Sequence, residues 1–258
     1  MTTDPAPPHT ASELLAVMSA RLLRDREVVF AGVGIPLLAA TLAQRLHGPG
    51  LTILFEGGTI GAYVEPGQLP PSTNDQRCTK RANMVLGSAD VLLLLQRGYV
   101  DVGFMGGAQI DQFGNLNSSF IGDPARPKTR LPGTGGGNDI SSLTNMIVAM
   151  KHEKRRFVSH VDFITSPGFI RGGTSRAASG LPAGGMFRVV TELAVFSFDD
   201  AERRMKVLAL NPGVSRERVQ DNTGFDLVFD ETVSVTEPLA ETELATLRML
   251  DPDRRFIA

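Results

Sequence analysis

The segments EVVFAGVGIP at residues 27–36 and LTILFEGG at residues 51–58 carry the clearest signals of the fold class. Each begins with a short apolar run that is typical of a buried β-strand, here over residues 27–31 and 51–55, and each strand runs straight into glycines. Pro36 suits the first turn of a helix, where its missing N–H group leaves no hydrogen bond unmade. Both segments therefore predict strands that end in tight, glycine-rich loops.

Strand and helix signals continue to alternate along the chain. Thr10 and Glu13 form a T-x-x-E capping box, so a helix is expected to open near Ala11. Apolar periodicity predicts further helices at residues 37–46, at 90–96, where the helix is expected to be buried, and at 241–250. Strands are expected at residues 101–105, 116–121, 145–150 and 161–165, and a flexible loop at 133–137.

The alternation of strand and helix signals ends in the C-terminal part of the chain. Three closely spaced strand signals follow one another at residues 187–190, 194–198 and 206–210, which indicates an antiparallel meander. The expected fold class is therefore α/β, with a largely parallel sheet flanked by helices and an antiparallel extension near the C-terminus. Ligands bind beyond the carboxyl ends of the strands in such sheets, and glycine-rich loops follow Ala31, Phe55 and Met105 at those ends.

Composition limits the class of protein. Hydrophobic residues make up 42% and charged residues 21% of the 258 residues, which excludes a mostly disordered chain. With neither a long linker nor an internal repeat, we expect a single domain over residues 11–258 behind a flexible tail at 1–10. The net charge of −2 argues against nucleic acid as a partner. The sequence shows no signal peptide and no membrane span, and its single cysteine favours the cytoplasm.

Several kinds of reactive site are disfavoured. The four histidines lack metal-ligand spacing, so no metal site is expected. Cys78 stands near Arg77 and Lys80, and is either a thiol of lowered pKa or an inert one. The basic run Lys151, Lys154, Arg155 and Arg156 is either a solvated end of a strand or helix, or a phosphate-binding patch.

One carboxylate stands out by its position. Glu56 follows an apolar strand and precedes Gly57 and Gly58. A glutamate at a strand end is often only a cap or an ion-pair partner. The alternative is a covalent nucleophile, because glycines without side chains let a substrate approach the carboxylate closely. The position alone leaves both interpretations open.

Separate motifs resemble one known family. The sequence GGAQID at residues 106–111, followed by GNLN at 114–117, resembles the GGAQID..GN.N segment of family I CoA-transferase β subunits, above all the glutaconate CoA-transferase type. The similarity extends from about Val28 to the C-terminus. It continues through IGD at 121–123, PKTR at 127–130, GTGGGN at 133–138, HEKRRF at 152–157, TSPG at 165–168 and NTGFDL at 222–227.

The resemblance implies a fold of the CoA-transferase type and a mechanism. Glu56 occupies the position of the family's catalytic glutamate, which attacks an acyl-CoA thioester and then carries CoA as a glutamyl thioester. Many family members have serine or asparagine where this chain has Gly57. Any assistance that those side chains give to the catalytic glutamate must therefore come from other residues here. Relatives that have lost the glutamate are linked to hydrolysis or decarboxylation of CoA esters, and its retention here argues against those outcomes.

The same resemblance suggests residues around the glutamate. The family's G-x-G-G loop matches residues 133–136 and continues to Gly137, so Gly135, Gly136 and Gly137 are candidate oxyanion or substrate-binding residues, unless the glycines only make the loop flexible. Gln109 is either a further oxyanion donor or the source of a structural hydrogen bond. The GVGIP turn resembles the family's G-x-G-x-P turn, so Gly32 and Gly34 are expected to shape the cleft together with Gly57 and Gly58.

The resemblance also implies substrates and a partner. The expected activity is transfer of CoA between an acyl-CoA and a short carboxylic or dicarboxylic acid, with no cofactor beyond the substrate coenzyme A. At 258 residues the chain corresponds to one half of the family's active site, so a separate α subunit is expected. The alternatives are a CoA-ester hydrolase on the same scaffold and, outside enzymes, a metabolite-sensing domain.

Overall fold

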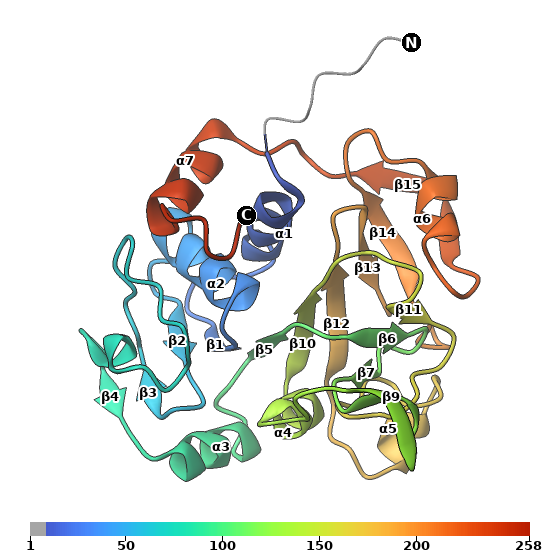
Figure 1. Ribbon diagram of the computed structural model, residues 1–258, viewed down its shortest axis with the longest axis horizontal. Helices are drawn as coiled ribbons and strands as arrows, with labels where there is room; N and C mark the ends of the chain where they lie inside the picture. The colour runs from blue at the N-terminus through green and yellow to red at the C-terminus, as the bar shows by residue number, and fades with distance from the viewer. Residues whose placement is uncertain (1–8) are drawn as a thin grey trace.

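A ten-stranded sheet runs through the molecule in the order β15-β14-β13-β12-β10-β5-β1-β2-β3-β4 (Figure 1). The computed structural model describes residues 9–258, so most of the tail predicted at residues 1–10 lies outside the described part. The strands of this sheet are β1 (Val28–Ala31), β2 (Thr52–Leu54), β3 (Thr59–Ile60), β4 (Met84–Val85), β5 (Val102–Met105), β10 (Asn145–Ala149), β12 (Gly185–Val190), β13 (Ala194–Ser197), β14 (Lys206–Leu210) and β15 (Val228–Val235).

Two smaller sheets and the helices complete the fold. Strands β11 (Phe157–Val158), β6 (Gln109–Asp111) and β7 (Leu116–Asn117) form one small sheet, and β8 (Phe120–Asp123) and β9 (Arg126–Arg130) form the other. The helices are α1 (Ala11–Ala20), α2 (Ile35–Leu46), α3 (Ser88–Gln96), α4 (Gly137–Leu143), α5 (Ser175–Ala178), α6 (Arg216–Asp221) and α7 (Glu241–Leu250), and a 3₁₀ turn, η1, spans Gln76–Thr79.

Strand directions confirm the predicted fold class. Neighbours pair in parallel from β12 through β10, β5 and β1 to β2, which makes the centre of the sheet parallel. Strands β12, β13 and β14 form the predicted antiparallel meander, and β15 then adds to β14 in parallel. At the opposite edge β3 and β4 are antiparallel additions.

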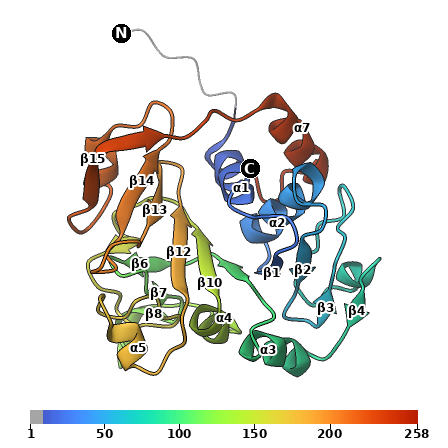
Figure 2. The same ribbon diagram turned by 180° about the vertical axis from the view of Figure 1, so that it is seen from behind.

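Alternating strand residues bury both faces of the sheet. Val29 and Ile53 belong to a core cluster shared with α1, α2 and α7, whereas Phe30 and Leu54 belong to a second cluster shared with α3 and α4. Successive side chains of a strand point to opposite faces, so each strand contributes to two apolar cores. Figures 1 and 2 show α1, α2 and α7 packed together, well apart from α3 and α4.

Three of the predicted strands and helices differ from the structure. Residues 161–165 form no strand, because within residues 9–258 pairing at this segment is limited to the isolated bridge between Leu116 and Ser166, and Thr165 Oγ1 accepts from Ser118 N–H instead of continuing a ladder. The helix expected to be buried at 90–96 is a surface helix, α3, in which only Val91 and Leu95 are buried. The predicted strand at 116–121 is divided between β7 and β8.

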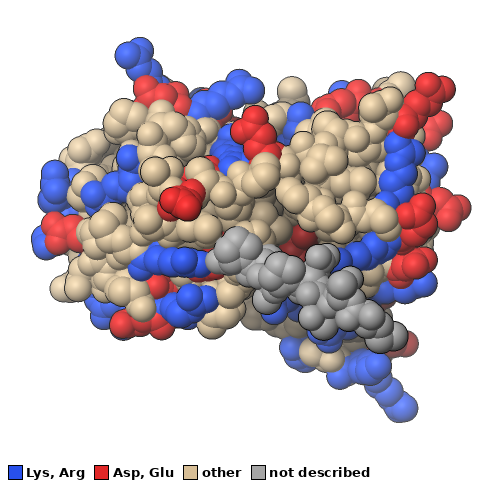
Figure 3. Space-filling view, turned by 90° about the horizontal axis from the view of Figure 1, so that it is seen from above, with Lys and Arg blue, Asp and Glu red and all other residues tan. Residues whose placement is uncertain are grey.

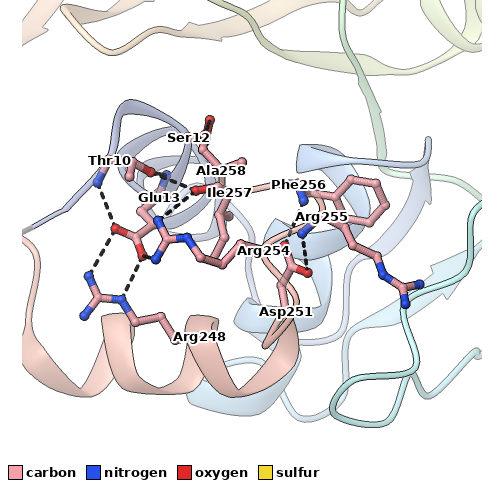
Figure 4. Close-up of polar contacts among 10 residues, drawn as sticks. All are labelled: Thr10, Ser12, Glu13, Arg248, Asp251, Arg254, Arg255, Phe256, Ile257 and Ala258. Atoms are coloured by element: carbon pink, nitrogen blue, oxygen red, sulfur yellow. Dashed lines mark hydrogen bonds and ion pairs between the residues drawn. The ribbon is translucent and has the colours of Figure 1, made fainter.

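The beginning of α1 is tied to the C-terminus (Figure 4). Thr10 and Glu13 form the predicted capping box, with Glu13 N–H donating to Thr10 Oγ1 at 3.1 Å and Thr10 N–H donating to a Glu13 carboxylate oxygen at 2.8 Å. Arg248 Nε donates to Glu13 at 2.8 Å, and Thr10 Oγ1 donates to Ile257 O at 3.0 Å. Glu13 is fully buried, and the hydrogen bond from Arg248 is the main reason that its pKa lies below the ordinary value.

Candidate active site

Glu56 lies in the turn between β2 and β3. The turn is closed by Gly58 N–H donating to Phe55 O at 3.0 Å and by Phe55 N–H donating to Thr59 O at 2.9 Å. The Glu56 side chain is only partly exposed. Within residues 9–258 the Glu56 carboxylate makes neither an ion pair nor a hydrogen bond. Within the described residues Glu56 therefore acts neither as a cap nor as an ion-pair partner, and its role as a nucleophile stays a prediction.

The glycines after Glu56 allow close packing of the chain. A Cβ atom at Gly57 would lie 2.5 Å from both Asn74 Oδ1 and Thr73 O, and one at Gly58 would overlap Leu86 O. Gly58 also has φ +103°, a conformation that other residues rarely adopt. Both glycines are thus required by the segments packed against the turn, a reason that the sequence did not reveal.

The glycine-rich loop comes directly against the glutamate. A Cβ atom at Gly136 would lie 3.3 Å from Glu56 Oε1, and one at Gly135 would lie 3.7 Å from the same oxygen. Gly136 is buried and Gly135 is exposed, so the loop passes the carboxylate at the molecular surface. The structure brings together these three predicted site residues from distant parts of the sequence.

The backbone N–H groups of this loop are not all free. Gly133 N–H donates to Ser118 O and Gly137 N–H donates to Thr134 O, each at 2.8 Å. By contrast, the N–H groups of Gly135 and Gly136 make no hydrogen bond within the described residues. Gly137 was predicted to belong to a flexible loop, but it is the first residue of α4. The two free donors belong to the glycines that lie beside Glu56.

Packing holds α4 and its glycines in place. A Cβ atom at Gly137 would lie 3.2 Å from Ser166 Oγ and 3.3 Å from Met105 Sδ. The buried Arg176 guanidinium donates to backbone oxygens on both sides, at 2.6 Å to Ser142 and at 2.9 Å to Gly168. Arg176 therefore fastens the end of α4 to the 167–168 segment. Sequence reasoning missed this residue, because a lone arginine outside any motif carries no signal.

Gln109 is held by a buried hydrogen-bond network. Its side-chain oxygen accepts from Asn117 Nδ2 at 2.7 Å, and Asn117 also donates to Phe120 O at 2.6 Å. This bond fixes the amide with its oxygen toward Asn117, so its NH₂ group points elsewhere. The structural hydrogen bond expected as one interpretation is present, and the donor role stays a prediction.

The GVGIP turn opens α2 as predicted. Gly34 is the N-cap with φ +94°, and Pro36 lies in the first turn. A Cβ atom at Gly32 would meet only Phe104 O at 3.7 Å, an ordinary contact. Gly34 therefore needs to be glycine for its backbone conformation, whereas Gly32 does not.

Cys78 and His152 are structural residues. Burial raises the pKa of the Cys78 thiol to about 11, which contradicts a lowered pKa and supports the inert interpretation. Burial lowers the pKa of His152 to about 3, and its ring stacks on Phe157 at 4.1 Å between centroids. The two ring nitrogens contact the hydroxyls of Thr191 and Thr223 at 3.2 and 2.9 Å.

Other features bear on the class of site. Within residues 9–258 no group of three His, Cys, Asp or Glu side chains is arranged to hold a metal ion. The described helices include none that is long and apolar enough to cross a membrane. Basic and acidic side chains are interspersed on the face seen in Figure 3.

Known proteins resemble the whole chain. The B subunit of 3-oxoadipate CoA-transferase from Pseudomonas knackmussii is 38% identical over 245 residues, 94% of each chain. The B subunit of glutaconate CoA-transferase from Acidaminococcus fermentans is 36% identical over 255 residues, 96% of this chain and 95% of that one. The crystal structure of the latter enzyme superposes with a TM-score of 0.92 at 35% identity, covering 98% of this chain and 99% of that chain.

The family profile matches in the same way. Residues 12–222, which include Glu56, Gln109 and the 133–137 loop, match the coenzyme A transferase family. Together with the two relatives above, this match covers the β2–β3 turn and every strand from β1 to β14. The chain belongs to the coenzyme A transferase family.

Proposed function

We propose that this chain is the β subunit of a CoA-transferase in which Glu56 carries coenzyme A between a donor acyl-CoA and an acceptor carboxylate. The observation that carries the proposal is the Glu56 carboxylate, unpaired within the described residues, beside Gly135 and Gly136, whose N–H groups are free there. A carboxylate without a partner can act as a nucleophile, and side-chain-free donors can stabilise the oxyanion that its attack creates.

The chemistry proceeds through two carboxylate derivatives of Glu56. Its carboxylate attacks the thioester carbonyl carbon, and collapse of the resulting oxyanion expels CoA thiolate and leaves an acyl-glutamyl anhydride. The thiolate then attacks the Glu56 carbonyl of the anhydride, releases the donor acid as its carboxylate and forms a glutamyl-CoA thioester. An acceptor carboxylate takes CoA by the reverse sequence. No electron is transferred, so this scheme requires no cofactor besides CoA.

The N–H groups of Gly135 and Gly136 have a defined task in this scheme. Negative charge develops on the attacked carbonyl oxygen, and preorganised N–H donors stabilise it without reorientation. Gly137 N–H is occupied by Thr134 O, so we assign the oxyanion to the two preceding glycines. The amide NH₂ of Gln109, held by Asn117, is the candidate for a third donor.

The proposal includes a separate α subunit. The segment from β4 to just beyond the end of α3 carries several large apolar side chains that are each between 36% and 64% exposed, those of Met84, Val85, Leu86, Leu93 and Tyr99. This segment adjoins the catalytic turn, because Leu86 N–H donates to Gly58 O at 2.9 Å. Exposed apolar side chains beside an incomplete site favour an interface. We therefore expect the isolated chain to lack transferase activity and to gain it when an α subunit is added.

Substrate class and location are the finer parts of the proposal. The two relatives act on 3-oxoadipate and glutaconate, as their names state, so we propose a short dicarboxylic acid as one substrate here. The single buried, free cysteine suits a reducing cytoplasm. The hydrolase and sensor alternatives have less support, because both relatives are transferase subunits.

Trapping of the thioester tests the central step. The assembled enzyme is incubated with acyl-CoA and then with borohydride, which reduces a glutamyl thioester, and the peptides are mapped by mass spectrometry. We expect the modification on Glu56 and its loss in Glu56→Ala. A label on another residue, or near-normal transferase activity in Glu56→Ala, would show that the nucleophile is misassigned.

A further inference from the structure

A basic cavity of about 350 Å³ has Gln109 as one of its lining residues. Three cationic side chains line it, those of Lys128, Arg155 and Arg156, together with apolar side chains that include Ile121 and Leu131. Arg155 and Lys128 are exposed to solvent and Arg156 is half-buried, and all three face a common space although the lysine comes from a distant hairpin.

Two separate segments bring these cations together. Arg155 and Arg156 precede β11, which pairs with β6, and Ile110 N–H donates to Arg156 O at 2.7 Å. Lys128 lies on β9 of the hairpin formed by β8 and β9. The strand pairing thus fixes the two arginines next to Gln109, and the hairpin supplies the third charge.

The positive charge of this cavity is only partly balanced. Glu153 accepts from Arg155 Nε at 2.6 Å and from Arg156 Nε at 3.1 Å, so one carboxylate serves two guanidinium groups. Lys128 has no carboxylate within 4.0 Å among residues 9–258. Three cations against one anion leave room for a ligand that carries negative charge, and guanidinium groups match phosphate oxygens well.

We propose that this cavity binds the phosphate groups of coenzyme A, which rests on the proposed function of the chain. The nucleotide end of CoA carries a 5′-diphosphate and a 3′-phosphate on one ribose, and so offers several anionic groups to several cations. Ile121 and Leu131 give the cavity an apolar wall for the rest of the nucleotide. A phosphate site here places the charged end of CoA at the surface and directs its thiol end toward the loop at residues 133–137.

The length of the pantetheine arm of CoA agrees with this placement of the phosphates. Leu131 lines the cavity and Gly135 adjoins Glu56. Four residues of extended chain span at most about 14 Å, so the cavity wall and the oxyanion donors are no farther apart than that. The pantetheine arm has roughly 13 chain atoms, about as many as four peptide residues, and extends to about 14 Å. The arm is thus long enough to bring the thioester to Glu56.

Comparison of donors with and without phosphates tests the site. The assembled enzyme is assayed with acyl-CoA, with acyl-dephospho-CoA, which lacks the 3′-phosphate, and with acyl-pantetheine, which lacks all phosphates. Lys128→Glu should lower kcat/KM for acyl-CoA by about 10–100-fold, the size expected for loss of a charged hydrogen bond, and leave acyl-pantetheine unchanged. Lys151→Glu is the matched control, because Lys151 belongs to the same basic run and does not line the cavity.

A measurement on the unaltered enzyme is independent of any variant. Adenosine 3′,5′-bisphosphate should compete with acyl-CoA, and adenosine should not. Equal losses for acyl-CoA and acyl-pantetheine in Lys128→Glu would overturn the proposal, as would an effect confined to the KM of the acceptor acid. Failure of the proposed function looks different: Glu56 would carry no adduct with any donor, while calorimetry would still show CoA binding that depends on Lys128.

Discussion

A methyl group added to Gly136 would lie 3.3 Å from Glu56 Oε1 and 3.4 Å from the carboxyl carbon of Glu56. Contacts of 3.3 Å are tighter than most Cβ atoms accept, so one of the two groups would have to move by a few tenths of an ångström. Gly136 has φ −76°, an ordinary conformation for any residue. Its lack of a side chain therefore matters for the space around the carboxylate and not for backbone strain.

Substitution of Gly136 should reduce turnover without unfolding the protein. Gly136→Ala should lower kcat about 10-fold and Gly136→Val by about 10²–10³-fold, since bulk displaces the carboxylate and the acyl group from the N–H donors. Steady-state kinetics of the assembled enzyme, with thermal melting in parallel, measure this. Gly48→Ala is the control, because its Cβ would make only ordinary contacts of 3.5 Å or more. Unchanged turnover in a folded Gly136→Val enzyme would remove the oxyanion assignment.

Gln109→Ala should lower kcat with little change in the KM for acyl-CoA. The reason is that a donor aimed at the oxyanion stabilises the transition state more than the bound substrate. Gln112→Ala is a matched control in the same segment, because the Gln112 side chain donates to Ser159 O at the surface. If Gln109→Ala lowers only the melting temperature, the residue serves the hydrogen bond with Asn117 alone.

His152 should make the protein sensitive to mild acid. Its pKa of about 3 in the folded protein lies below the value of 6.5 in the unfolded chain. Between these two values the unfolded chain binds a proton that the folded protein does not bind. Stability should therefore fall as the pH drops below 6.5, by up to about 2 kcal/mol at pH 5 from this group. Urea unfolding at pH 7 and pH 5 measures the loss. His152→Asn should be less stable at pH 7, yet lose less on acidification, and an equal loss in both proteins would contradict this account.

Glu13 should contribute stability that disappears at lower pH. Its folded pKa is lowered, mainly by the hydrogen bond from Arg248, so the contribution is complete above the unfolded value of 4.5 and is lost as the pH falls through the folded pKa. Glu13→Gln should lower the free energy of unfolding by about 1–2 kcal/mol at pH 7, as for a lost helix cap, and by less near pH 3. Glu241→Gln, at an exposed site in α7, should change little. A Glu13→Gln deficit that is constant with pH would be inconsistent with this linkage.

Neighbouring residues were enough to predict the local elements. These elements depend on interactions between residues close in the sequence, so local patterns suffice to predict them. They are the capping box of Thr10 and Glu13, the turn that ends with Pro36 and the apolar strands on either side of that turn. Continuously apolar strands predicted a sheet covered on both faces, and the two core clusters confirm it. Glu56 was recognisable from its place at a strand end and from the resemblance of the surrounding motifs.

The surroundings of that glutamate depend on contacts between segments far apart in the chain. The approach of Gly135 and Gly136, the packing of Asn74 against Gly57 and the fastening of α4 by Arg176 all join segments that are distant in the sequence. The strand predicted at 161–165 failed for the same reason, because Thr165 contacts Leu116 O through its N–H group and Ser118 N–H through its hydroxyl, and no continuous strand ladder forms. Contacts of this kind depend on which strand ends and loops the folded sheet brings to the same edge. No local pattern of residues contains that information.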